Sequence, residues 1–123
     1  MPLDTIVDLR NLSIFQRNIL VLSDVNLTID KGEFVYLIGK TGTGKSSLLK
    51  TLYAELPVIE GDAEVVGYNL SKLRKSEVPY PRRKLGIVFQ DFQLLSDRSV
   101  NDNIKFVMKA TGWKDKNEMN DRI

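Results

Sequence analysis

The sequence contains neither cysteine nor histidine. Without cysteine there is no disulfide, thiolate nucleophile or Cys-ligated zinc, and without histidine there is no imidazole base or imidazole metal ligand. Ser-His-Asp hydrolases and HExxH metalloproteases are therefore excluded. Long hydrophobic runs are also missing, since residues 34–38 fall far below the roughly 18 residues of a membrane helix. Asp4 and Asp8 do not fit a secretory signal, so we expect a cytosolic protein.

The chain has little excess charge of either sign. Eighteen basic against sixteen acidic side chains leave a net charge of +2, spread along the sequence, which gives no reason to expect a nucleic-acid partner. With 123 residues, of which 42% are hydrophobic and 28% charged, the composition is that of an ordinary globular protein. We expect a single domain or part of a larger one.

Two kinds of strand pattern are present. Apolar and polar residues alternate in residues 24–30, which predicts a half-buried strand of an antiparallel sheet. Residues 34–38 are apolar without interruption, which predicts a strand covered on both faces in a parallel sheet. Residues 85–89 form a second run of this kind, and we expect it to join the same sheet.

Helical patterns follow the first apolar run. The spacing of leucines predicts a helix over residues 45–54. A capping pattern at Ser99 predicts a second helix, which ends at Gly112. We also expect a short strand over residues 63–67 and the start of another helix in residues 114–123.

A phosphate-binding motif lies between the first apolar run and the first helix. Residues 39–46 read GKTGTGKS and fit the P-loop pattern G-x-x-x-x-G-K-[ST]. Glycines let backbone amides approach phosphate oxygens at the positive end of the following helix. The alternative is a glycine-rich turn, but a strand before and a helix after favour the phosphate site. The predicted nucleotide-binding residues are Gly39, Lys40, Thr41, Gly42, Thr43, Gly44, Lys45, Ser46 and Ser47.

Three of these side chains have predicted roles. Lys45 is the candidate catalytic residue, which neutralises the β- and γ-phosphates. The Ser46 hydroxyl is a candidate Mg²⁺ ligand, and Ser47 is placed one residue further to reach the α-phosphate.

The position of the P-loop in the sequence indicates which class of P-loop protein this chain resembles. More than thirty residues with antiparallel patterning precede it, whereas small nucleoside kinases usually open with the P-loop strand. With antiparallel strands before its P-loop, the chain resembles an ATP-binding cassette (ABC). The resemblance implies that Phe15 stacks on adenine, the alternative being a buried core aromatic. It also implies that Gln90 is a catalytic residue that contacts Mg²⁺ and orients water, the alternative being a solvated loop glutamine.

A further resemblance is carried by residues 77–80, 82–83, 85–92, 94–95 and 97–104. Through these stretches the sequence resembles the FtsE family of cell-division ATPases over residues 9–110, although Pro81 departs from the family pattern. The resemblance implies ATP and Mg²⁺ as cofactors and a homodimer of cassettes. It also implies a place on the inner face of the plasma membrane, with membrane contact only through an FtsX-like polytopic subunit. ABC transporters of the lipoprotein-release or macrolide-export type are the alternative.

Several motifs of that family do not occur in these 123 residues: the Leu-Ser-Gly-Gly-Gln signature, the Walker B strand and the switch histidine. We therefore expect an α/β P-loop NTPase fold that is the N-terminal part of an ABC nucleotide-binding domain, truncated. An antiparallel β-subdomain and the start of a parallel-sheet core would occupy about residues 1–93, and the start of the helical subdomain residues 94–123. Such a chain would bind ATP with little or no hydrolysis by itself. A natural non-hydrolysing half-cassette is the alternative.

Overall fold

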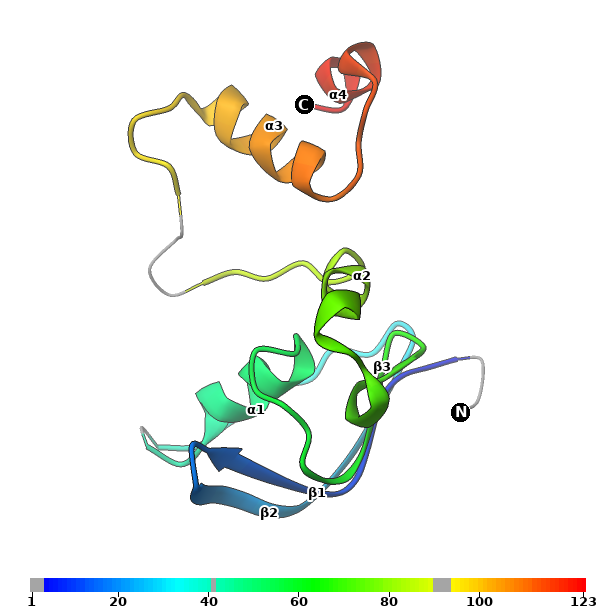
Figure 1. Cartoon of the computed structure of the whole chain (residues 1–123), viewed down its shortest axis with the longest axis vertical. Coiled ribbons are helices and arrows are strands. Elements are labelled where there is room, and N and C mark those ends of the chain that lie inside the picture. Colours follow the sequence, from blue (N-terminus) through cyan, green and yellow to red (C-terminus); the bar gives the residue numbers. More distant parts are fainter. Residues whose placement is uncertain (1–3, 41, 90–93) are drawn as a thin grey trace. The chain divides into compact units, whose positions relative to one another are not determined.

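The computed structural model describes residues 4–40, 42–89 and 94–123. The chain divides into two compact units, Met1–Leu85 and Gly86–Ile123 (Figure 1). Each unit has its own secondary structure.

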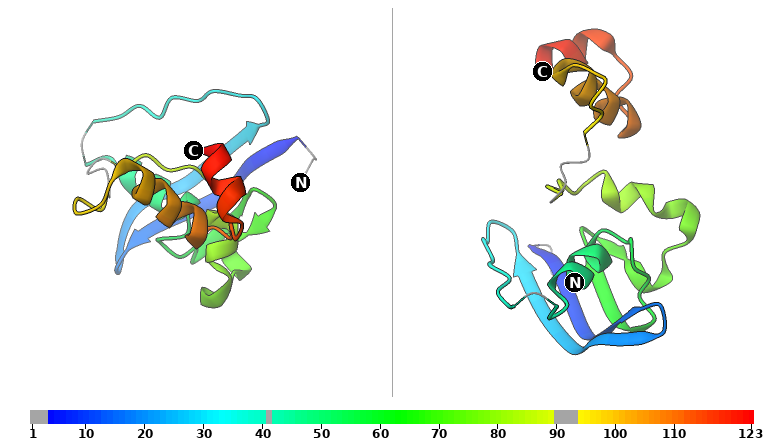
Figure 2. Two further views of the ribbon diagram at one scale, coloured as in Figure 1. Left: turned by 90° about the horizontal axis from the view of Figure 1, so that it is seen from above. Right: turned by 90° about the vertical axis from the view of Figure 1, so that its left-hand side faces the viewer.

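The first unit is built on a four-stranded antiparallel sheet. β1 (Thr5–Gln16) pairs with β2 (Ile19–Asp30) on one side and with β3 (Glu60–Val65) on the other, and β3 pairs with the short β4 (Tyr68–Asn69). The strand order is β2-β1-β3-β4. Figure 2 shows the β1–β2 hairpin from two further directions. The predicted antiparallel strand over residues 24–30 is confirmed as part of β2. The short strand predicted over residues 63–67 is present as β3, but it ends at Val65 and a turn follows.

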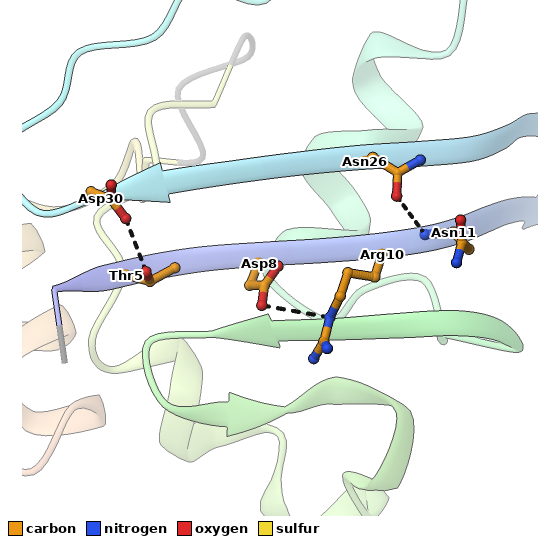
Figure 3. Close-up of polar contacts among 6 residues, drawn as sticks. All are labelled: Thr5, Asp8, Arg10, Asn11, Asn26 and Asp30. Carbon is orange, nitrogen blue, oxygen red and sulfur yellow. Dashed lines mark hydrogen bonds and ion pairs between the residues drawn. The ribbon is translucent and has the colours of Figure 1, made fainter. Parts of the chain in front are cut away.

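Polar side chains hold the register of the hairpin (Figure 3). The Thr5 hydroxyl donates to the Asp30 carboxylate at 2.9 Å. Asn11 lies at a register shift with a φ of +49°, and its backbone N–H donates to the Asn26 side-chain oxygen at 3.0 Å. The side chain thus satisfies a donor at a break in the strand ladder.

The core of this unit lies between the sheet and the first helix, α1 (Lys45–Leu52). Alternate residues of β1 and β3 are buried, as expected for strands with one covered face. α1 contributes Leu48, which confirms the helix predicted there. The buried apolar residues are Val7, Leu9, Leu12, Ile14, Leu48, Ala63, Val65 and Leu70.

Residues 34–38 and 85–89 do not form the parallel strands predicted for them. Phe34 and Ile38 are 81% and 88% exposed, and Val88 is 97% exposed. An extended segment becomes a strand only when a neighbour satisfies its backbone groups. In the part of the chain that the structure describes, every strand pairing belongs to the antiparallel sheet, so the predicted parallel core is not formed.

Short helical turns complete the first unit: η1 (Leu70–Lys72), η2 (Lys75–Glu77) and α2 (Pro79–Arg82). A helical turn forms at α2 although Pro81 has no backbone amide to donate. Pro79 occupies the first position of α2, where a helix has no acceptor for an amide. The Arg82 guanidinium donates through Nε to the Tyr53 carbonyl at 2.8 Å, which ties α2 to the end of α1.

The second unit contains α3 (Val100–Ala110) and α4 (Lys116–Arg122). The Ser99 hydroxyl accepts from the Asp102 amide at 3.1 Å, and Gly112 follows α3 with a φ of +105°, so both predicted ends of this helix are confirmed. Trp113 lies in the connection between the helices, and Met119 of α4 is buried. No helix among the described residues is long and apolar enough to span a bilayer.

Candidate functional site

The P-loop folds as a turn directly before α1. The Thr43 amide and hydroxyl both donate to the Lys40 carbonyl, at 3.2 Å and 2.6 Å. Gly42 and Gly44 have φ values of +85° and +96°, in the left-handed region that favours glycine. The backbone conformation thus explains two of the motif's glycines. Thr41 lies outside the described residues.

The beginning of the loop is closely packed. A Cβ atom at Gly39 would lie 2.7 Å from the Thr43 hydroxyl, so a larger residue there would require the Thr43 side chain to move. The Lys45 ammonium reaches back and donates to the Gly39 carbonyl. The candidate catalytic lysine is therefore placed over the loop it follows and is only partly buried.

The partial positive charge at the N-terminus of α1 is not compensated by a side chain. Gly44 at its N-cap has no side chain to accept from the first amides, and the first turn holds no acidic residue. The Leu48 amide makes the first helical bond, to the Gly44 carbonyl at 3.0 Å. Amides of a helix end that have no side-chain cap are suited to an anion.

The two serines that follow Lys45 have different surroundings. Ser46 is exposed, and within the described residues its hydroxyl has no protein partner. Ser47 is buried, and its hydroxyl donates to the side-chain oxygen of Gln16 at 3.2 Å. Sequence reasoning did not single out Gln16. The available signal was its place two residues after the buried Ile14, on the same face of β1, although Gln16 itself is exposed.

Phe15 lies one residue before Gln16, whose side chain contacts Ser47. Phe15 is half-buried and pairs with Leu20 across the hairpin. Gln90, the other residue implied by resemblance, lies outside the described residues.

The residues present fit a phosphate group and its metal ion. The loop supplies a glycine cradle, a positive helix end and a lysine, and together these suit the phosphates of a nucleotide. An exposed serine hydroxyl suits a Mg²⁺ ion that keeps phosphate oxygens and water as further ligands. The described residues hold no acidic cluster that would bind a metal ion independently of a nucleotide.

Comparison with known sequences identifies relatives of this chain. The family model described as ABC transporter matches residues 22–123. The cell division ATP-binding protein FtsE of Mycobacterium tuberculosis is 45% identical over 91 residues, which are 74% of this chain and 40% of that protein. FtsE of Streptococcus pneumoniae is 40% identical over 78% of this chain and 42% of its own length. The methionine import ATP-binding protein MetN of Helicobacter pylori is 34% identical over 96% of this chain and 36% of its own length.

Solved structures give the same result for the fold. The dimeric bacterial ABC transporter cassette MJ0796 superposes with a TM-score of 0.82 at 28% identity, over 95% of this chain and 53% of that one. The same cassette bound to ADP and phosphate gives a TM-score of 0.81. The predicted cassette fold is therefore confirmed. The chain spans about two-fifths of the length of the FtsE relatives it matches.

Proposed function

The chain belongs to the ABC transporter family, and on that premise we propose that it binds MgATP through residues 39–47. The observation that carries the proposal is the placement of Lys45 and the uncapped start of α1 around one glycine-rich turn. This arrangement favours a polyphosphate-binding site over a purely structural turn. An uncompensated helix end stabilises a bound anion, whereas it contributes nothing to the stability of a turn.

Each side chain has a defined task in this proposal. Lys45 exchanges the Gly39 carbonyl for the β- and γ-phosphates and neutralises their charge. Ser46 ligates Mg²⁺ through its exposed hydroxyl, and Gln90 contacts the same ion and orients water. Phe15 stacks on adenine. A Mg²⁺ ion held by Ser46 would offset the negative charge of the phosphates.

We further propose that these 123 residues bind ATP with little or no turnover when alone. Phosphoryl transfer depends on positioning and on charge stabilisation from several directions. The signature sequence, the Walker B strand and the switch histidine do not occur here. Hydrolysis would then require a dimer of complete cassettes.

For the biological role we propose the nucleotide-binding part of an FtsE/FtsX-like complex in cell division. The FtsE relatives share 36–45% identity with this chain, against 33–34% for the MetN relatives. A methionine-importer role is the second candidate, because the MetN match covers 96% of the chain. Pull-down with tagged FtsX-like and MetN-partner permeases distinguishes them. Preferential capture by the importer permease would contradict the division role.

Calorimetric titration with MgATP tests the nucleotide site. We expect Lys45→Ala to weaken binding by at least about tenfold, because a charge-assisted contact is lost. Lys50→Ala in the last turn of the same helix is the matched control and should bind like the parent chain. Equal affinity of the Lys45 variant and the parent would refute the proposed site. Robust ATPase activity that Lys45→Ala abolishes would refute the claim of little turnover.

A further inference from the structure

Gln16 is the last residue of β1, and its side chain contacts α1. Leu12 and Ile14 precede it at intervals of two residues and are buried in the core that includes Leu48 of α1. By the two-residue period of a strand, Gln16 continues this face. Its side-chain oxygen accepts from the Ser47 hydroxyl at 3.2 Å.

Apolar packing holds this part of the hairpin against the helix independently of the hydrogen bond. A Cβ atom added to Gly44 would lie 2.8 Å from Cγ of Leu22 and 3.0 Å from Cγ1 of Val21. Both neighbours belong to β2, which pairs with β1 at this end of the sheet. The distance between Gln16 and Ser47 is therefore maintained by contacts on either side of it.

The Ser47 hydroxyl has a single proton to donate. While that proton is shared with the Gln16 oxygen, it is not available to a phosphate oxygen. Ser47 is buried, so its hydroxyl needs a partner in either arrangement. An ionised phosphate oxygen is a stronger acceptor than a neutral amide oxygen, so a nucleotide is able to displace Gln16.

We propose that Gln16 is a positioning residue of the nucleotide site, which holds the Ser47 hydroxyl until a phosphate oxygen of the nucleotide replaces it. The exchange frees the Gln16 side chain, while the apolar contacts keep β1 against α1. In the parent chain the nucleotide must break the Gln16–Ser47 hydrogen bond when it binds, and this loss lowers its affinity. This inference rests on the proposed nucleotide site and assigns a role to a residue outside its motif.

The test is a double-mutant cycle with Gln16→Met and Ser47→Ala in the 123-residue chain. Methionine keeps the length of the side chain and removes the acceptor. We expect Gln16→Met to bind MgADP about three- to tenfold more tightly than the parent in a calorimetric titration. The same substitution should have no effect in the Ser47→Ala background. Ile19→Ala, at the residue paired with Gln16, is the control and should leave affinity unchanged.

Urea unfolding of the same four proteins without nucleotide measures the hydrogen bond by itself. Coupling between the two sites in unfolding, together with tighter binding of Gln16→Met, supports the proposal. Unchanged or weaker binding of Gln16→Met, or an effect that persists with Ser47→Ala, would overturn it while leaving the nucleotide site intact. Coupling in unfolding with no nucleotide binding by any of the four proteins would overturn the proposed function and this exchange together.

Discussion

The side chain of Asn103 pairs with both backbone groups of Leu95. Its oxygen accepts from the Leu95 amide at 2.8 Å, and its nitrogen donates to the Leu95 carbonyl at 3.1 Å. The same nitrogen lies within hydrogen-bond distance of the Arg98 and Ser99 carbonyls. One side chain on α3 therefore replaces a strand neighbour for the segment that leads into the helix.

Replacement of Asn103 by alanine should free this segment from α3. We expect amide hydrogen exchange at Leu95 to accelerate by at least about fivefold, since a partly buried hydrogen bond contributes about 1 kcal/mol. Asn117→Ala on α4 is the matched control, because its contact with Asp115 is made by the backbone amide. Equal exchange rates at Leu95 in the two variants would contradict this role.

Two leucines with opposite exposure test the position of the core. Leu9 in β1 is 1% exposed, and Leu49 in α1 is 50% exposed. Leu9→Ala should lower the free energy of unfolding by about 2–5 kcal/mol, as expected for a buried cavity. Leu49→Ala should change it by well under about 1 kcal/mol. Urea denaturation measures the unfolding free energy of both variants. Similar decreases for the two would contradict this position of the core.

Two glycines with similar backbone conformation test the contact between the hairpin and the P-loop. Gly44 and Gly67 have φ values of +96° and +86°, so alanine is strained by about 1–2 kcal/mol at either position. A Cβ atom at Gly67 would meet open space, whereas at Gly44 it would meet Leu22. We expect Gly44→Ala to destabilise the chain more than Gly67→Ala. The melting temperatures of the two variants provide the comparison, and an equal decrease would argue against the contact.

Tyr53 should make stability depend on alkaline pH. Burial raises the pKa of its phenol above the usual value of 10.0, and a hydrogen bond and charge from Glu55 add to this, while Arg82 opposes it. Since the folded state favours the neutral phenol, its contribution is complete below pH 10 and is lost as the pH rises through the folded pKa. Tyr53→Phe should flatten the decline in unfolding free energy above pH 10. An identical pH profile for both proteins would exclude this origin.

Local patterns in the sequence were sufficient for elements stabilised by local interactions. β2 follows from alternation, and α3 follows from the Ser99 cap and Gly112. The strands expected over residues 34–38 and 85–89 depend on distant neighbours, and an apolar run carries no information about whether those neighbours are present. These two segments are apolar, as buried strands are, but they do not form strands.

The candidate site also contains one part that a local pattern predicts and one part that depends on distant residues. The P-loop motif located residues 39–47 because spacing and residue type encode its backbone turn. The contact of Gln16 with Ser47 joins residues 31 positions apart and depends on the close approach of β1 to α1. The alternation in β1 indicated only the face of the strand on which Gln16 lies. No local pattern specified its partner.

The division of the chain into two units has a spectroscopic consequence. The single tryptophan, Trp113, belongs to the helical unit, whereas all four tyrosines, Tyr36, Tyr53, Tyr68 and Tyr80, belong to the unit with the sheet. Emission excited selectively at the indole therefore reports on the helical unit, and the near-ultraviolet dichroism of the phenols reports on the sheet. A single titration with denaturant follows both signals and shows whether the two units lose their structure together or in turn.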